Sequence, residues 1–389
     1  MGALSASRKI SEVASPLVSV VVPTFNRPEG LRRVLTAFEQ QRPNDLPFEV
    51  VVVDDGSEDG TSELLASWRS RRYPLRFARQ ANGGPARARN RALTVASGEI
   101  VLFGGDDIEP HPDLVSEHVR EHNRRGDPRV AVLGLTRWPE GEELTSTMRH
   151  IDGPGGQQFS YPVFTDGAEY DFRHFYTSNV SLRRDLLASE TDGFSTEFSA
   201  AAFEDAELAY RLSMRGMRII YRESALAWHH HHYDARSFFK RQLKCGEMAD
   251  VFVRAHPQLA KWIDLRVLMW HRLEVLTADH AYRAKIAQVR SELESWERRA
   301  IDLAVFLDEP ATDLVDPLLH ALFRYGFVKG LAMARFGSDG GRTLAADQWL
   351  RLLPAAVDIL SKRALKRGVP LSSSDVEAII AIARVDSDS

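Results

Sequence analysis

Leu17-Val-Ser-Val-Val-Val22 is the stretch that decides the fold, because it is a nearly continuous run of β-branched residues. Such a run is typical of a strand that is buried on both faces, as in a parallel sheet. Residues 31–38 then carry apolar side chains at helical spacing, and a second buried run, Phe48-Glu-Val-Val-Val-Val53, follows them. The order of strand, helix and strand predicts the start of an α/β domain.

The alternation continues through the next fifty residues. Strands are predicted near residues 75–78 and 100–103, with a helix over residues 86–96 between them. We therefore predict a doubly wound, mostly parallel sheet. In such a sheet the functional loops lie at the carboxyl ends of the strands.

The sequence after this unit changes in character. Residues 141–171 mix glycines with aromatic side chains, and we expect an irregular, partly mobile segment, since surface loops of this length are uncommon unless they have a function. A helix is predicted over residues 204–215, followed by short strands at residues 217–221 and 225–228.

Helical patterning with few turn signals begins at about residue 249. We therefore divide the chain into a disordered tail (1–16), an α/β domain (17–248) and a helical C-terminal region (249–385).

Composition excludes several classes of protein. The 389 residues carry a net charge of -4, which argues against a dedicated nucleic-acid binder. A single cysteine, Cys245, excludes an intrachain disulfide and a zinc site built from cysteines. No signal peptide and no apolar stretch of membrane-spanning length is present, so we expect a cytoplasmic protein. Contact with a membrane surface and self-association stay open.

Acidic pairs follow two of the predicted strands. Asp54-Asp55 lies in a turn rich in Gly and Ser, where it could bind a base or ribose or serve only the turn and the next helix. Asp106-Asp107 directly follows a buried strand, where two adjacent carboxylates repel each other unless a cation neutralises them. The alternative for this second pair is a solvated loop.

Two later motifs also carry ionisable side chains. Glu204-Asp205 begins a predicted helix, whose N-terminus keeps a carboxylate ionised and ready to accept a proton, although simple capping uses the same residues. In Trp228-His-His-His-His232, alternate side chains of an extended segment share a face. His229 and His231 then point one way and His230 and His232 the other, so that one of the two pairs could bind Mn²⁺ beside carboxylates. At least two of the four histidines are expected at the surface or behind the site.

The order and spacing of the motifs resemble the inverting glycosyltransferases of family 2, which have the GT-A nucleotide-sugar-binding fold. The resemblance covers about residues 17–246 and leaves the helical remainder uncovered. It rests on these segments: Val18-Ser-Val-Val-Val-Pro-Thr-Phe-Asn-Arg27, Val52-Val-Asp-Asp-Gly-Ser-Glu-Asp-Gly-Thr61, Asn82-Gly-Gly-Pro-Ala-Arg-Ala-Arg-Asn-Arg-Ala-Leu93, Gly98-Glu-Ile-Val-Leu-Phe-Gly-Gly-Asp-Asp107, Ser178-Asn-Val-Ser-Leu182, Asp192-Gly-Phe194 and Phe203-Glu-Asp-Ala-Glu-Leu-Ala-Tyr-Arg-Leu212.

The resemblance implies a role for each matching residue. In the family's Asp-X-Asp element, Asp106 lies toward the ribose and Asp107 binds Mn²⁺ or Mg²⁺, while Gly105 replaces the usual first Asp. Asp205 matches the catalytic base, and His229, followed by His231, is favoured as the histidine that completes the metal site. The donor nucleotide is bound by Pro23, Thr24, Phe25, Arg27, Asp54, Asp55, Asn82, Arg87 or Arg89, and Asp106.

The implied reaction is a single in-line displacement that moves a sugar, with UDP-sugars favoured, to a hydroxyl of a carbohydrate, lipid-linked or other acceptor. Two rivals stay open: a nucleotidyltransferase, which lacks a glycine-rich phosphate loop here, and a non-catalytic scaffold. A dinucleotide dehydrogenase is excluded, because no Gly-x-Gly-x-x-Gly follows the first strand.

Overall fold

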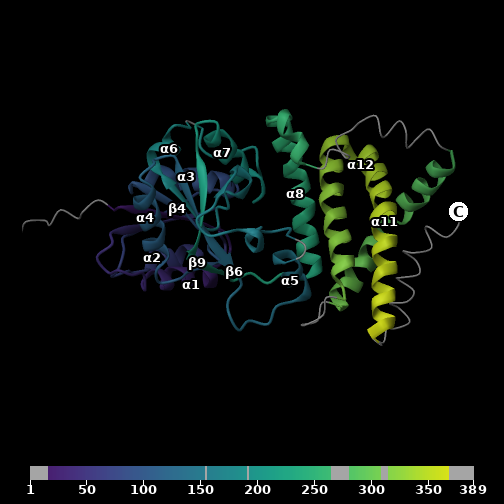
Figure 1. Cartoon of the computed structure of the whole chain (residues 1–389), viewed down its shortest axis with the longest axis horizontal. Coiled ribbons are helices and arrows are strands. Elements are labelled where there is room, and N and C mark those ends of the chain that lie inside the picture. The colour runs from purple at the N-terminus through teal and green to yellow at the C-terminus, as the bar shows by residue number, and fades with distance from the viewer. Residues whose placement is uncertain (1–15, 154–155, 191, 264–279, 308–313, 368–389) are drawn as a thin grey trace, which may run out of the picture.

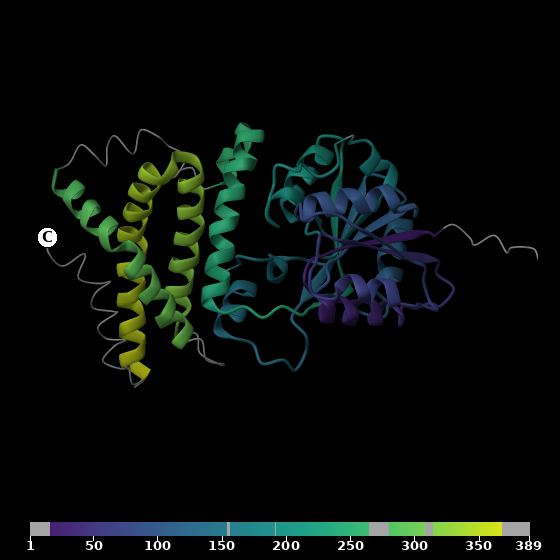
Figure 2. The same cartoon turned by 180° about the vertical axis from the view of Figure 1, so that it is seen from behind.

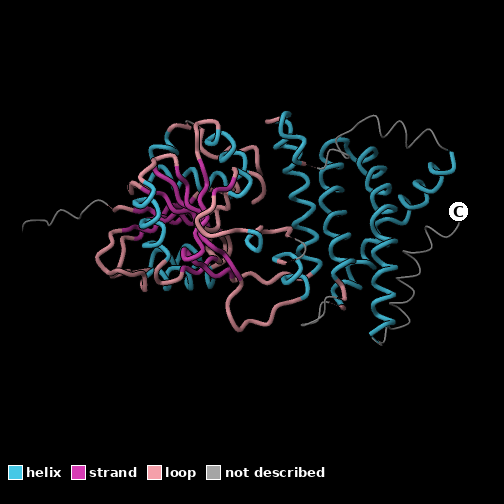
Figure 3. The backbone as a smooth tube through the Cα atoms, viewed as in Figure 1, coloured by secondary structure: helices cyan, strands magenta, loops and turns pink. Residues whose placement is uncertain are grey.

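The computed structural model describes residues 16–153, 156–190, 192–263, 280–307 and 314–367. Figure 1 shows an α/β domain with a group of long helices beside it, and Figure 2 shows the same arrangement from behind. The strands gather in the centre of the α/β domain, whereas the other part is helical (Figure 3). The predicted tail up to residue 15 and the end of the helical region from residue 368 lie outside the described residues.

The first four strands in the order of the sequence are parallel to one another. Strand β1 (Val18–Thr24) pairs with β2 (Phe48–Asp54) on one side and with β4 (Ile100–Phe103) on the other, and β2 pairs with β3 (Leu75–Arg79). Thr24 lies opposite Asp54 in this register. The ends of β1 and β2 and the loop after β4 therefore meet at one edge of the sheet, as predicted.

The second half of the sheet is mixed. Strand β8 (Val180–Arg183) runs antiparallel between β4 and β6 (Val130–Arg137), and β9 (Arg218–His229) is parallel to β6. The short strands β5 (Ile108–Pro110) and β7 (Glu169–Tyr170) are antiparallel to β9. The order is β3-β2-β1-β4-β8-β6-β9-β5, with β7 beside β9. The predicted α/β class with a mostly parallel sheet is confirmed.

Strand β9 differs from the sequence prediction, which had two short strands at residues 217–221 and 225–228. It is one continuous strand with a shift of register opposite Gly134 and Leu135, where the paired residue jumps from Arg222 to Leu226. A bulge of this kind bends a strand without ending it. The continuous strand carries His229 to a position opposite Ile108, beside the Asp106-Asp107 loop.

Helices cover both faces of the sheet because β1 and β2 are apolar on both faces. Val20, Val22 and Val52 pack in one core with helices α1, α2 and α4, whereas Val21 and Val53 pack in another with α3 and α7. The alternation follows from the two-residue repeat of a strand. The helices of this domain are α1 (Pro28–Phe38), α2 (Thr61–Ser67), α3 (Pro85–Val95), α4 (Leu114–Arg125), α5 (Ser146–Asp152), α6 (Arg184–Ala188) and α7 (Glu204–Ser213).

The segment predicted to be irregular, residues 141–171, contains α5, the short 3-10 helix Tyr161–Val163 and β7, and a second 3-10 helix, Phe172–His174, directly follows it. Its aromatic side chains pack on one another, with ring centroids 5.3 Å apart for Phe159 and Tyr161 and 4.2 Å apart for Phe164 and Tyr170. Aromatic contacts therefore organise much of this segment.

The C-terminal region is helical where it is described, as predicted. It comprises α8 (Ala235–Ala255), the 3-10 helix Pro257–Trp262, α11 (His280–Phe306) and α12 (Asp316–Arg367), which is interrupted by non-helical backbone at Gly337. Helix α8 runs through the boundary predicted near residue 249. None of the helices in the described part of the chain is long and apolar enough to span a membrane.

Helices α8 and α12 cross closely through glycines. A Cβ atom on Gly330 would lie 2.0 Å from the carbonyl oxygen of Leu243, and one on Gly246 would lie 2.0 Å from that of Phe327. No real Cβ atom tolerates such distances. The two backbones can therefore approach this closely only because neither position has a side chain.

Gly330→Ala should destabilise the protein. Alanine is normally favoured over glycine inside a helix by about 1 kcal/mol, but here the added carbon forces the two helices apart. We expect the free energy of unfolding, measured by urea titration, to fall by about 1–3 kcal/mol. An increase would show that the helices do not cross at this point.

Candidate active site

The carboxyl edge of the sheet collects the predicted site residues. Thr24 ends β1, Asp54 ends β2, and the Asp106-Asp107 loop follows β4. The hydroxyl of Thr24 donates a hydrogen bond of 2.8 Å to Asp106 Oδ2 and so ties the first strand to this loop. The edge is therefore held together by side chains as well as by the sheet.

Asp107, His229 and His231 form a cluster of the kind that binds metals. Asp107 Oδ2 lies 3.6 Å from His229 Nε2 and 3.3 Å from His231 Nδ1. One ligand atom from each residue can be chosen so that all three lie within 4.8 Å of one another. His230 faces elsewhere, with its ring nitrogens 2.6 Å from Glu109 and 3.3 Å from Glu142. The alternation predicted for an extended segment accounts for this arrangement.

Aromatic rings orient both histidines. The ring of Trp138 stacks on that of His229 with centroids 5.0 Å apart and an interplanar angle of 12°. Tyr233 packs on His231 at 4.2 Å. Trp138 was not among the predicted site residues. It directly follows β6, the parallel neighbour of β9, and therefore lies at the same edge of the sheet. The signal in the sequence was the apolar run Val130-Ala-Val-Leu133, which begins that strand.

The two adjacent carboxylates respond differently to burial. Burial, followed by the charge of Asp107, raises the pKa of Asp106 to about 6, against the opposing effects of Arg27 and Thr24. Burial also raises the pKa of Asp107, but hydrogen bonds from His229 and His231 and the charge of Arg27 outweigh it and hold that pKa well below its usual range. Asp107 is therefore ionised at neutral pH.

The side chains of the Asp107, His229 and His231 cluster fit a divalent metal. They offer one ionised carboxylate and two imidazoles from a short segment, and the neighbouring Asp106 adds negative charge that favours a cation. Mn²⁺ accepts nitrogen and oxygen ligands together, whereas Mg²⁺ prefers oxygen. This chemistry favours Mn²⁺ over Mg²⁺ at these residues.

The first acidic pair organises the loops at the other side of the edge. Asp54 accepts hydrogen bonds from the backbone N–H of Ser57 (2.8 Å) and the hydroxyl of Ser62 (2.5 Å), which is the turn role considered in sequence analysis. Asp55 accepts from the backbone N–H groups of Gly83 (2.9 Å) and Gly84 (2.8 Å). The pair thus brings the loop that contains Asn82 next to the turn after β2.

The other nucleotide-binding candidates differ in exposure. Phe25, 46% exposed, presents an aromatic face to solvent near this turn. Arg87 is exposed in the first turn of α3, whereas Arg89 is buried and donates a hydrogen bond of 2.8 Å to Glu204. Of the two arginines that were considered for the donor, only Arg87 has its side chain free of such burial, and Arg89 holds the start of α7 instead.

Asp205 lies in the first turn of α7, as predicted. The preceding residue but one, Phe203, has a left-handed backbone (φ 67°), which is uncommon for a bulky side chain and often marks a functional site. Burial, followed by the charge of Glu204, raises the pKa of Asp205 to about 7, and Arg89 opposes this rise. A carboxylate with such a pKa is suited to accept a proton near neutral pH.

Comparison with known proteins identifies the family. Residues 19–188 match the family model described as "Glycosyl transferase family 2". Over 332 residues the chain is 30% identical to validoxylamine A glucosyltransferase of Streptomyces hygroscopicus subsp. limoneus. The alignment covers 78% of this chain and 69% of that protein. The chain belongs to glycosyltransferase family 2. The resemblance found in the sequence is confirmed.

The chain is also similar to a further relative and to a solved structure. This family member is 28% identical over 258 residues to the uncharacterized glycosyltransferase YfnE of Bacillus subtilis (strain 168), covering 55% of this chain and 64% of that one. The crystal structure of Staphylococcus aureus TarS 1–349 superposes with a TM-score of 0.47 at 19% identity, covering 82% of this chain and 92% of the other.

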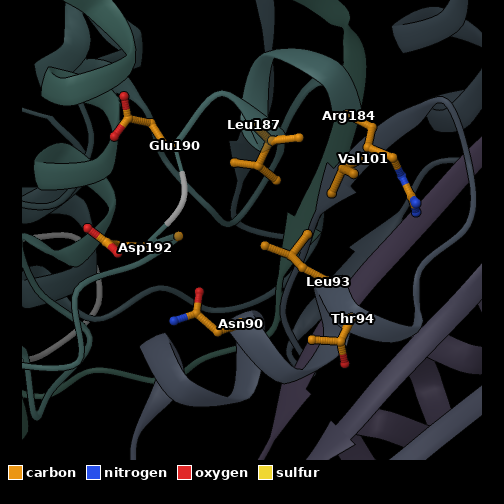
Figure 4. A pocket seen from close by; sticks show the side chains of 10 residues that line it. Asn90, Leu93, Thr94, Val101, Arg184, Leu187, Glu190 and Asp192 are labelled. Carbon is orange, nitrogen blue, oxygen red and sulfur yellow. The ribbon is translucent and has the colours of Figure 1, made fainter.

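A cavity of 410 Å³ lies elsewhere in the domain. It is lined by Asn90 and Thr94 of α3, Val101 of β4 and residues around α6, including Arg184 and Glu190 (Figure 4). None of the residues predicted to bind the donor nucleotide or the metal, and not the predicted base, lines it. The cavity therefore has no part in the candidate active site.

The raised pKa of Asp205 predicts an acidic limb in the pH profile. A base must be deprotonated to act, so kcat/KM for donor turnover should fall about tenfold per pH unit below about pH 7. Glu204→Gln removes a negative charge and should move the limb to lower pH. Arg89→Met removes a positive charge and should move it to higher pH. A limb that stays in place in both folded variants would contradict this assignment.

Proposed function

We propose that this family 2 enzyme transfers a sugar from a nucleotide-diphosphate sugar to a hydroxyl acceptor, with inversion, dependence on a divalent metal and Asp205 as the base. The observation that carries the proposal is that the chain combines an ionised cluster of the kind that binds metals, at the carboxyl edge of the sheet, with a carboxylate in the first turn of α7 whose pKa is about 7. Neither a nucleotide-binding scaffold nor a structural domain requires both features.

The two groups belong to one connected set of side chains. The ring of Tyr233 packs on that of His231. Burial raises the pKa of Tyr233, the charge of Arg241 lowers it, and the charge of Asp107 raises it. Arg241 in turn donates a hydrogen bond of 3.0 Å to Cys245, and that thiol lies close enough to Asp205 for its pKa to be affected by the carboxylate. The cluster and the base are thus connected through Tyr233 and helix α8.

We assign the donor to the edge formed by the ends of β1, β2 and β4. Pro23, Phe25, Asp54, Asp55 and Asn82 are proposed to border the nucleobase of the donor, and Asp106 with Thr24 its ribose. Arg27 and Arg87 supply positive charge for the diphosphate. Glucosyl transfer by the similar validoxylamine A enzyme supports a hexosyl donor, and UDP-glucose is the first to test.

Mn²⁺ or Mg²⁺ held by Asp107, His229 and His231 would supply positive charge that stabilises the departing diphosphate. The chain's own residues perform the proton transfer. Asp205 accepts the proton from the acceptor hydroxyl as that oxygen attacks the anomeric carbon from the face opposite the diphosphate. The anomeric configuration inverts. The acceptor hydroxyl is proposed to belong to a growing polysaccharide, a glycolipid or another glycoconjugate.

The helical region also belongs to the proposal. Together with burial, the charges of Glu204 and Asp205 help to raise the pKa of the Cys245 thiol on α8, and α8 in turn packs closely on α12 through Gly246 and Gly330. We infer that the described helices of the C-terminal region (predicted as 249–385) brace the side of the catalytic domain (17–248) that carries Asp205. The free, buried Cys245 suits a reducing compartment, so a cytoplasmic location is part of the proposal.

Asp205→Asn separates catalysis from binding. The amide cannot accept the proton, so kcat should fall by about 10²–10⁴-fold. Binding of UDP in the presence of Mn²⁺, measured by calorimetry, should stay within about twofold because Asp205 is not among the proposed donor residues. Asp358→Asn, at an exposed position of α12, serves as the matched control and should keep both properties.

Two results would contradict the proposal. Full turnover by Asp205→Asn would show that Asp205 is not the base. A product that keeps the donor's anomeric configuration, as read from its NMR coupling constant, would rule out a single displacement.

A further inference from the structure

The guanidinium group of Arg27 lies on the two carboxylates that border the proposed metal. Arg27 Nη1 donates a hydrogen bond of 3.1 Å to Asp106 Oδ1 and a shorter one to Asp107 Oδ2. Its other terminal nitrogen, Nη2, lies 3.5 Å from His231 Nδ1. A single cation therefore contacts the same oxygen of Asp107 that faces both histidines.

The fold provides a place for this side chain. Arg27 lies between Asn26, whose backbone is left-handed (φ 50°), and the first residue of α1. A Cβ atom on Gly30 would lie 3.3 Å from two carbons of the Arg27 side chain and 2.6 Å from the carbonyl oxygen of Asp106. The absence of a side chain at residue 30 thus leaves the room in which the Arg27 stem reaches the loop.

Arg27 also retains a path away from the carboxylates. Its side chain is 40% exposed, whereas those of Asp106 and Asp107 are 11% and 16% exposed. Thr24 donates a hydrogen bond to Asp106, and His231 lies against Asp107. The more exposed Arg27 is therefore the group that can move away from the two carboxylates. A long side chain at the start of a helix can change rotamer without moving the backbone.

A divalent metal and this guanidinium compete for Asp107. Two cations on one carboxylate oxygen repel each other strongly at contact distance, above all where burial weakens solvent screening. A metal that binds Asp107, His229 and His231 therefore has to displace Arg27. Once displaced, the guanidinium lies beside the metal without an anionic partner, and a diphosphate is the anion whose geometry it matches.

We propose that Arg27 is a built-in counter-ion, which neutralises Asp106 and Asp107 before the metal and donor bind and is then transferred to the donor's diphosphate. This inference rests on the metal site of the proposed function. It adds that metal and nucleotide bind cooperatively, because the metal releases the guanidinium that the nucleotide needs. By linkage, the nucleotide must raise the affinity for the metal by the same factor.

The test measures Mn²⁺ binding by the full chain through the loss of the free-ion EPR signal, with and without UDP. Arg27→Met should bind Mn²⁺ alone roughly tenfold more tightly than wild type, because the competing cation is gone. UDP should increase the Mn²⁺ affinity of the wild type by a larger factor than that of Arg27→Met. Arg33→Met removes an exposed charge from the same helix and should match wild type. Asp107→Asn should abolish the binding in either background.

The outcomes separate the two proposals. If Asp107→Asn leaves Mn²⁺ binding intact, the metal site itself is wrong and the counter-ion falls with it. If Asp107→Asn abolishes binding but Arg27→Met binds Mn²⁺ no more tightly than wild type, the metal site stands and the counter-ion is overturned. Arg27→Gln, which keeps a polar side chain at this position, replaces Arg27→Met if thermal melting shows the latter to be unfolded, and the same increase is required of it.

Discussion

Electrostatic repulsion between two neighbouring carboxylates is the constraint on which the rest of this active site depends. Asp106 and Asp107 are both largely buried at the end of β4, and together they are unfavourable without compensating positive charge or hydrogen-bond donors. The structure provides this compensation with Thr24 and Arg27 from the end of β1 and the loop after it, and with His229 and His231 from the end of β9. The continuous strand β9 and the rings of Trp138 and Tyr233 are needed to bring the histidines there.

The second functional carboxylate is treated in the opposite way. Asp205 is surrounded by groups that raise its pKa, with burial first and the charge of Glu204 next. Arg89 is paired with Glu204 and so limits the rise without making a hydrogen bond to Asp205 itself. The structure thus keeps Asp107 ionised and raises the pKa of Asp205 to about 7, which is what the proposed roles of metal ligand and base require.

Much of this arrangement could be predicted from the sequence. Buried β-branched runs defined β1, β2 and β4, and acidic residues directly after them predicted a functional edge. Strand alternation predicted that His229 and His231 share a face. These features follow from local patterns, which a single sequence displays directly.

Pairings between distant residues could not be predicted. Arg89 meets Glu204, and Arg27 meets Asp107, only because the sheet brings segments about 80 to 115 residues apart to one edge. Arg89 was therefore considered for the donor, although it is buried in an ion pair. The bulge in β9 was likewise read as a gap between two strands, because Arg222-Glu-Ser224 is polar and resembles a turn.

Calorimetric titration of UDP, GDP, dTDP and CMP, each with and without Mn²⁺, tests the central claim most directly when it is made on the wild type and on Asp107→Ala. If Asp107 helps to hold a metal that completes the donor site, one nucleotide should bind the wild type only when Mn²⁺ is present, and this binding should be lost in the variant. Equal binding with and without Mn²⁺, unchanged in Asp107→Ala, would contradict the account.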